Sequence, residues 1–141
     1  MWKALLVDDE EGIRKLLKTV LEMEDFSVQT ADSAGNSLPL LQSHTYDVVI
    51  TDLRMESQFA GYEVARAAAR LDPRPTIVIV TAFPVPASEW RSVGADALFT
   101  KGANTLHLAK HLIKLLESRH ATTKPSNAAH RPRTFFRRDF S

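Results

Sequence analysis

Two nearly continuous runs of β-branched residues, VVI at 48–50 and IVIV at 77–80, constrain the fold of this chain most. Strands that are buried on both faces of a parallel sheet have this composition, whereas half-exposed strands alternate apolar and polar residues. Three shorter runs of the same type bring the expected number of strands to five. The predicted strands are Lys3–Val7, Ser27–Thr30, Val48–Thr51, Thr76–Val80 and Ala97–Thr100.

Apolar residues at helical spacing separate these runs. Pro39 is expected to begin or kink the second helix, and the fourth, around Ala87–Val93, is expected to be short. Alternating strands and helices predict an α/β fold, a doubly wound five-stranded parallel sheet with helices on both faces. The helical stripes are Ile13, Leu16, Leu17, Val20 and Leu21; Val64, Ala67, Ala68 and Leu71; and, after a predicted Asn104 cap, Leu106, Ala109, Leu112, Ile113 and Leu116.

The charges divide the chain unevenly. Residues 1–118 hold 12 Lys/Arg and 16 Asp/Glu, whereas residues 119–141 hold 6 and 1. The pattern predicts one acidic domain over 1–118 and a basic, disordered tail over 119–141, to which no function is assigned. The tail is too short for a DNA-binding domain, and no apolar run is long enough for a membrane span. The absence of cysteine excludes disulfides and fits a cytoplasmic location.

Polar side chains follow the ends of four predicted strands. Asp8 and Asp9 end the first strand, Asp52 the third, Thr81 the fourth and Lys101 the fifth. Taken alone, each has an ordinary explanation, such as a helix-dipole contact, a turn or a solvated charge. Ligands of open α/β sheets bind beyond the carboxyl ends of the strands, so the coincidence of all five at one edge favours a functional site.

The types of these residues indicate phosphoryl chemistry. Clustered carboxylates raise one another's pKa unless a cation compensates, and oxygen-rich clusters of this kind suit Mg²⁺. A carboxylate beside Mg²⁺ can attack phosphorus, while Lys101 and Thr81 neutralise the oxygens of the transferring group. Glu10 and Glu11 are assigned instead to the start of the following helix.

Four segments carry a resemblance to a known family, namely LLVDDEEGIRKLL, VVITDLRM, VIVTAF and GADALFTK. Together they resemble the CheY-like response-regulator receiver domain over roughly residues 3–117. The resemblance implies strand order 2-1-3-4-5. It also implies Asp52 as phosphoacceptor, with Thr81 and Lys101 contacting the phosphoryl group. The implied Mg²⁺ ligands are Asp9, Asp52 and the Arg54 backbone carbonyl, with Asp8 acting through water.

The same comparison implies partners. The phosphoryl donor is expected to be a sensor histidine kinase or a phosphotransfer protein, and the output an unidentified downstream protein target. The chain is not expected to be an enzyme beyond catalysing its own phosphorylation and dephosphorylation. Whether it forms a homodimer is left open.

Several positions depart from the family pattern. Gly102 replaces the usual proline after Lys101, and since a cis bond without proline costs about 2.5–4 kcal/mol, the Lys101–Gly102 peptide is expected to be trans. Leu98 stands where the family often has an aromatic switch residue. In the loop after Asp52, Glu56 replaces a proline and Gly61 arrives one residue late. The signalling geometry is therefore expected to differ more than the phosphoryl chemistry.

Two groups of side chains are assigned to regulation and output. Arg54 and Phe83 match positions that border the path of the hydrolytic water, so they are expected to set the lifetime of the phosphoryl group. A predicted output face combines the switch position with a basic face of the last helix. Its residues are Leu98, His107, Lys110, His111 and Lys114.

Two alternative functions remain open. The altered switch position and short fourth helix would suit a pseudo-receiver, a protein-interaction module that is never phosphorylated. A Mg²⁺-dependent phosphohydrolase of the haloacid-dehalogenase type uses similar groups. That family needs a second aspartate two residues after its nucleophile, where this chain has Arg54.

Overall fold

The structure, a computed structural model, describes residues 1–102 and 105–123. Ten elements alternate along the chain, as the sequence predicts. They are β1 (Trp2–Val7), α1 (Glu11–Met23), β2 (Phe26–Ala31), α2 (Ala34–Ser43), β3 (Val48–Asp52), α3 (Ala60–Ala69), β4 (Thr76–Thr81), α4 (Ala87–Ser92), β5 (Ala97–Thr100) and α5 (Thr105–Thr123).

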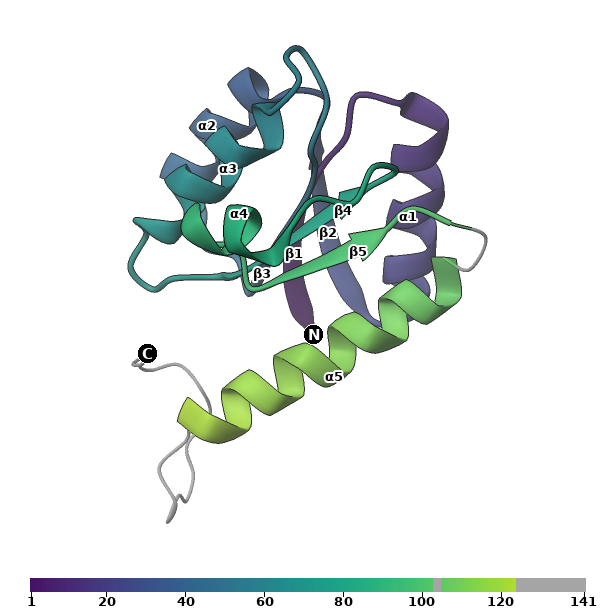
Figure 1. Ribbon diagram of the computed structural model, residues 1–141. Coiled ribbons are helices and arrows are strands. Elements are labelled where there is room, and N and C mark those ends of the chain that lie inside the picture. Colours follow the sequence, from purple (N-terminus) through teal and green to yellow (C-terminus); the bar gives the residue numbers. More distant parts are fainter. Residues whose placement is uncertain (103–104, 124–141) are drawn as a thin grey trace.

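The five strands form one parallel sheet with the order β2-β1-β3-β4-β5 (Figure 1). The predicted doubly wound fold is therefore confirmed. The central strands β3 and β4 are buried along their whole length, which explains their continuous β-branched composition. Because every strand runs in the same direction, the carboxyl ends of all five meet at one edge.

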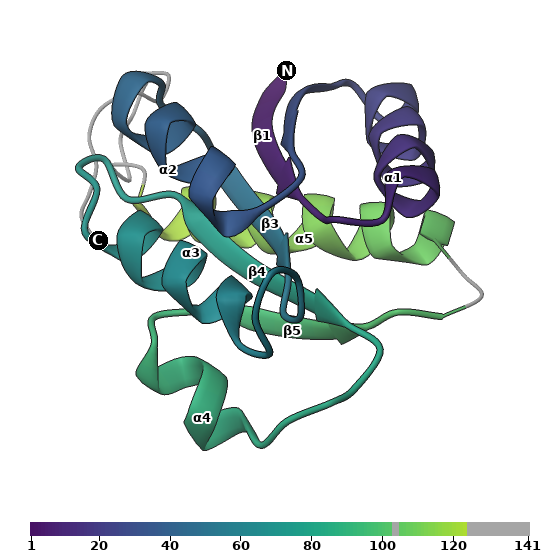
Figure 2. The ribbon, with the colours of Figure 1, turned by 90° about the horizontal axis from the view of Figure 1, so that it is seen from above.

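Helices cover both faces of the sheet and enclose two separate cores. Leu5 and Val49 pack on the face covered by α2, α3 and α4. Leu6 and Ile50, one residue further along each strand, pack on the face covered by α1 and α5. This alternation follows from the two-residue period of a strand. Figure 2 shows the short helix α4 at the margin of the molecule, next to β5.

Some helix predictions need correction. α2 begins at Ala34, because the Ser33 side chain accepts a hydrogen bond from Asn36 N at 2.9 Å and so caps the helix. Pro39 lies inside this helix, so of its two predicted roles the one as helix start is wrong. In α1, the predicted core residue Leu16 is 49% exposed, whereas Leu17 is buried.

Helices α4 and α5 test the predicted short fourth helix and the predicted domain boundary at residue 118. α4 has only six residues, which confirms that it is short. α5 continues through the predicted domain boundary at 118 and ends at Thr123. The predicted cap Asn104, the side chain of Leu106 and the rest of the predicted tail, 124–141, lie outside the described residues. Within the described ranges, no helix has the length and apolar character needed to cross a bilayer.

One carboxylate joins several elements at the edge of the sheet opposite the strands' carboxyl ends. Asp96, which directly precedes β5, accepts a hydrogen bond from Ile77 N at 2.8 Å. The same side chain pairs with Arg74 at 3.1 Å and with Arg119 of α5 at 3.2 Å. Its side chain is only 14% exposed, so this carboxylate links the start of β4 to α5 in a largely buried setting.

We expect Asp96→Ala to lower the free energy of unfolding by about 2–3 kcal/mol, because hydrogen bonds to charged groups contribute about 1.5–3 kcal/mol and one backbone donor is left without its acceptor. Urea unfolding measures the change. The control is Lys18→Ala, which removes an exposed helical ion pair with Glu22 at 3.0 Å and should cost only about 0.3–0.5 kcal/mol. Equal losses in the two variants would contradict this role for Asp96.

Candidate functional site

The parallel register brings the predicted site residues together. Val7 of β1 pairs with Thr51 of β3, so Asp8 and Asp52 come next to each other at the ends of neighbouring strands. Thr81 is the last residue of β4 and pairs with Thr100, which directly precedes Lys101. Asp8, Asp52 and Thr81 are all buried.

The ammonium of Lys101 lies among three carboxylates. Its Nζ is 2.9 Å from Asp52 Oδ2, 3.1 Å from Asp8 Oδ2 and 3.2 Å from Glu10 Oε1. The Lys101 side chain is 17% exposed, so these contacts are shielded from water more than surface ion pairs are. One cation therefore offsets part of the charge of three carboxylates that would otherwise repel one another.

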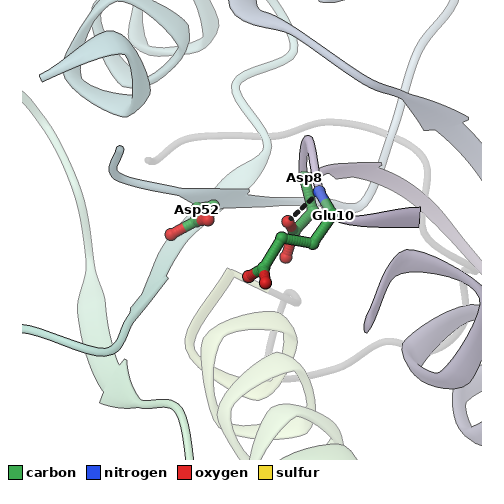
Figure 3. A group of neighbouring side chains, drawn as sticks. All are labelled: Asp8, Glu10 and Asp52. Carbon is green, nitrogen blue, oxygen red and sulfur yellow. Dashed lines mark hydrogen bonds between the residues drawn. The ribbon is translucent and has the colours of Figure 1, made fainter. Parts of the chain in front are cut away.

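Backbone groups fix the carboxylates on both strands. Asp8 Oδ1 accepts from Glu10 N at 2.9 Å, and Asp52 Oδ1 accepts from Leu53 N at 2.7 Å. Figure 3 shows Asp8 and Glu10 after one strand and Asp52 at the end of the next, with the bond between Glu10 N and Asp8 drawn. In each buried aspartate, the second oxygen faces Lys101.

The pKa values of the central pair are both displaced upward. Burial raises the pKa of Asp52 above its ordinary value of 3.8, and repulsion from Asp8 adds to the rise, although Lys101 opposes both. Burial alone would lower the pKa of Lys101, but its hydrogen bonds to Asp52 and Asp8 outweigh burial and raise it. The surroundings therefore favour the charged form of Lys101. They disfavour the charged form of Asp52, so ionising Asp52 costs more free energy than ionising an aspartate in water.

The structure changes which acids form the cluster. Among the described residues, the acids that could share a cation are Asp8, Glu10 and Asp52, whose ligand oxygens lie within 4.8 Å of one another. Glu10, predicted to serve the helix start, caps α1 with its backbone only and turns its carboxylate to Lys101. Asp9, predicted as a direct metal ligand, is exposed and lies outside this group of three.

The cluster suits a hard divalent cation. All three groups are carboxylates, and oxygen donors that keep access to water are the ligands that Mg²⁺ prefers. Glu10 is 63% exposed and borders solvent, whereas Asp8 and Asp52 face inward. The donor set therefore fits Mg²⁺, with the Lys101 ammonium as the positive charge already beside it.

Thr81 is hydrogen-bonded away from the carboxylates. Its Oγ1 accepts from Phe83 N at 3.1 Å, within the loop that leads to α4. The Thr81 carbonyl accepts from Lys101 N at 2.7 Å, so the ends of β4 and β5 are tied directly. The hydroxyl donates to the Phe83 carbonyl at 3.4 Å, so it must turn its hydrogen away from that carbonyl before it can donate to a group on Asp52.

The two predicted lifetime residues contact each other. The Arg54 guanidinium lies over the Phe83 ring, 4.1 Å from its centroid. Both side chains are exposed, and they come from the loops after β3 and β4. They form a cation–π pair across the two loops that flank the ends of these strands.

The predicted output face divides in the structure. On α5, the side chains of His107, Lys110, His111 and Lys114 are exposed, as expected for a solvated face. His111 also stacks on the ring of Phe99, with centroids 5.8 Å apart. Leu98 is half-buried and packs against the core beneath α2, α3 and α4, so it does not share the α5 surface.

The backbone conformation is defined at two positions that depart from the family pattern, Gly102 and Gly61. Among the described residues, the Asp72–Pro73 bond is the one cis peptide, so Lys101–Gly102 is trans as predicted. A Cβ on Gly61 would lie 2.2 Å from the Asp52 carbonyl oxygen. Only glycine fits there, directly behind the candidate phosphoacceptor.

Comparison with known proteins finds one family for most of this chain. Residues 4–113 match the model of the response regulator receiver domain. The transcriptional regulatory protein YvrH of Bacillus subtilis is 32% identical over 111 residues, which are 77% of this chain and 46% of that protein. GlrR of Escherichia coli is 38% identical over 78 residues, which are 55% of this chain and 17% of that protein. The chain thus spans less than half the length of these relatives.

Solved structures agree with the fold. A CheY-like receiver domain protein from Methanospirillum hungatei superposes with a TM-score of 0.76 at 26% identity, covering 84% of this chain and 95% of that one. The response regulator TrrA of Thermotoga maritima, solved in complex with Mg²⁺-BeF, superposes with a TM-score of 0.72 at 34% identity. That match covers 82% of this chain and 99% of TrrA.

We expect Asp52→Asn to unfold at a higher temperature than the wild type at neutral pH in EDTA. Because the folded-state pKa of Asp52 is raised, the stability that its protonation contributes is present below the unfolded value, about 3.8, and is lost as the pH rises through the folded value. Asparagine mimics the protonated form at every pH. Its advantage should therefore shrink as the pH falls toward 3.8.

Thermal unfolding followed by circular dichroism across this pH range measures the difference. Glu117→Gln, at an exposed carboxylate of α5 outside the cluster, serves as the control and should follow the wild type. An Asp52→Asn protein that is less stable than the wild type at neutral pH would contradict the prediction.

Proposed function

The chain belongs to the response regulator receiver domain family, and from that membership we propose that it accepts a phosphoryl group on Asp52 from a phosphohistidine donor. The observation that carries the proposal is the Lys101 ammonium, which binds the Asp52 carboxylate at 2.9 Å beside Asp8 and Glu10. This arrangement of a carboxylate, a fixed cation and two further acids at one edge of the sheet supports a nucleophile beside metal-binding groups.

The reaction transfers one group between two side chains. An Asp52 carboxylate oxygen forms a bond to phosphorus while the bond from phosphorus to the donor histidine nitrogen breaks. Lys101 already contacts one Asp52 oxygen and would follow the negative charge onto the phosphoryl oxygens. Thr81 would turn its hydroxyl hydrogen from the Phe83 carbonyl to a phosphoryl oxygen. The donor is proposed to be a sensor histidine kinase or a phosphotransfer protein in the cytoplasm.

Mg²⁺ is the proposed cofactor, and when bound it would supply positive charge to the oxygens of the transferring group. The carboxylates that lie ready to hold it are Asp8, Glu10 and Asp52. The family resemblance adds Asp9 and the Arg54 backbone carbonyl. The structure of TrrA contains Mg²⁺-BeF, which supports a cation in a related receiver domain.

Phosphorylation would alter the surface around the strand ends. It adds roughly 1.5 to 2 negative charges to Asp52, next to Lys101 and Thr81. Donation by Thr81 to the phosphoryl group would release the Phe83 carbonyl and so loosen the loop that leads to α4. The output is proposed to be contact with a downstream protein, since such a shift biases which surface is presented.

The test is phosphorylation by acetyl phosphate with Mg²⁺, followed by intact mass. We expect one phosphoryl adduct, stable in acid and labile in base, that is lost in Asp52→Asn and kept in Asp25→Asn. No adduct on the wild type would favour the pseudo-receiver. Multiple turnover of varied phosphate esters would favour a phosphohydrolase.

The contact between Arg54 and Phe83 is proposed to slow loss of the phosphoryl group. Replacing both residues in an Arg54→Asn, Phe83→Glu variant removes a pair worth about 0.5–1 kcal/mol at an exposed site. We expect hydrolysis to quicken by about two- to fivefold, the factor that this energy represents in a rate. The decay of the adduct, followed by mass, measures the rate.

Arg91→Asn is the matched control, because Arg91 makes a similar contact with Trp90 on α4, with its guanidinium carbon 5.0 Å from the ring centroid. Its adduct should decay at the wild-type rate. Unchanged hydrolysis in the double variant would remove the support for this role.

A further inference from the structure

Glu56 reaches from the loop after β3 to the start of α2. Its Oε1 accepts from Ala34 N and its Oε2 accepts from Gly35 N, both at 3.0 Å. A carboxylate that bonds two backbone donors at a helix N-terminus also meets the positive end of the helix dipole. Glu56, which stands where the family usually has proline, therefore joins the loop after β3 to the start of α2. Its partners Ala34 and Gly35 lie 22 and 21 residues earlier in the sequence.

The contact is additional to the ordinary cap of this helix. Ser33 already caps α2 from within the local sequence, by accepting from Asn36 N at 2.9 Å. Glu56 accepts from the backbone N–H groups of Ala34 and Gly35, to which the Ser33 side chain does not bond. The helix start is thus held by one local side chain and by one side chain of the loop that follows the candidate phosphoacceptor.

The same loop is fixed on both sides of Arg54. On one side, the Leu53 carbonyl accepts from Gly61 N at 2.9 Å. On the other, Met55 N donates to the Ser57 carbonyl at 3.0 Å, across Glu56. In a planar trans peptide the N–H and the C=O point in opposite directions. The Met55 N–H bond therefore sets the direction of the Arg54 carbonyl, which belongs to the same peptide unit.

We propose that Glu56 is a positioning residue that, by fastening this loop to the N-terminus of α2, fixes the direction of the Arg54 backbone carbonyl, the one backbone ligand proposed for Mg²⁺. The inference rests on the proposed function for the identity of that ligand. Glu56 itself touches neither the cation nor the phosphoryl group. Its effect passes through the turn at 55–57.

The competing explanation is that Glu56 only stabilises α2. Ser33→Ala separates the two, because it weakens the start of the same helix and leaves the Glu56 contact in place. The variants of Glu56 are Glu56→Ala, which removes both acceptors, and Glu56→Gln, which keeps one acceptor oxygen and the side-chain length. The comparison uses the full chain throughout.

The decisive measurement is Mg²⁺ affinity by calorimetric titration of the unphosphorylated protein. Loss of a group that orients a metal ligand typically weakens affinity by 10–100-fold. We expect Glu56→Ala to raise the Kd for Mg²⁺ by about tenfold, Glu56→Gln to fall between it and the wild type, and Ser33→Ala to match the wild type. If Glu56→Ala does not fold, Glu56→Gln still carries the comparison.

A spectroscopic readout follows the coupling directly. In ¹H–¹⁵N spectra, the amide signals of Ala34 and Gly35 should shift when Mg²⁺ is added to the wild type, although both lie outside the metal cluster. In Glu56→Ala these shifts should disappear. In Ser33→Ala they should persist, because the loop remains attached.

Two results would overturn the proposal: an unchanged Kd for Mg²⁺ in Glu56→Ala, or an equal rise of Kd in Glu56→Ala and Ser33→Ala. A wild-type protein that binds no Mg²⁺ would overturn it as well. Failure of the proposed function is distinguishable, since a wild type that binds Mg²⁺ but gains no phosphoryl group on Asp52 leaves the Glu56 comparison intact.

Discussion

The contact between Lys101 and the acids at the end of the sheet determines how the rest of the site is arranged. Parallel pairing of β1 with β3 forces Asp8 and Asp52 together, and both are nearly buried. Two such carboxylates repel each other and lose hydration, so they need a cation within a few ångströms. Lys101 supplies it from the end of β5, beyond β4, with Nζ within 3.2 Å of each acid. A single side chain thereby connects the centre of the sheet to its edge.

In this arrangement the Lys101 ammonium and the Thr81 hydroxyl are already bonded within the protein, so any new partner must compete for them. Lys101 is shared among three carboxylates, and the Thr81 hydroxyl is held by the backbone of Phe83. A new anion on Asp52 would compete for both. A ligand shifts the equilibrium between two conformations only if its contacts differ between them. The exchange of contacts by Lys101 and Thr81 would supply that difference, so that phosphorylation would change the surface of the protein.

The sequence predicts most of the fold and the buried half of the site, for identifiable reasons. The strands follow from β-branched runs, and Asp8, Asp52, Thr81 and Lys101 follow from strand ends that must meet at one edge.

The predictions fail where tertiary contacts decide. Glu10 turns to Lys101, 91 residues away, and Glu56 turns to α2, so no local pattern announces either contact. Leu16 fits the helical period of α1 but lies outside its buried face, and α2 starts after the Ser33 cap and not at Pro39.

The loop after β3 shows how a site can tolerate change close to its reactive group. The bond from Gly61 N to the Leu53 carbonyl closes this loop at its base, and the absent side chain of Gly61 lets the base press against Asp52. Residues 54–59 form the loop outside that closure, and lengthening a closed loop costs little free energy, about 0.6 kcal/mol for each doubling. The chain can therefore gain or lose residues here, and acquire contacts such as that of Glu56, while the reactive carboxylate stays in place.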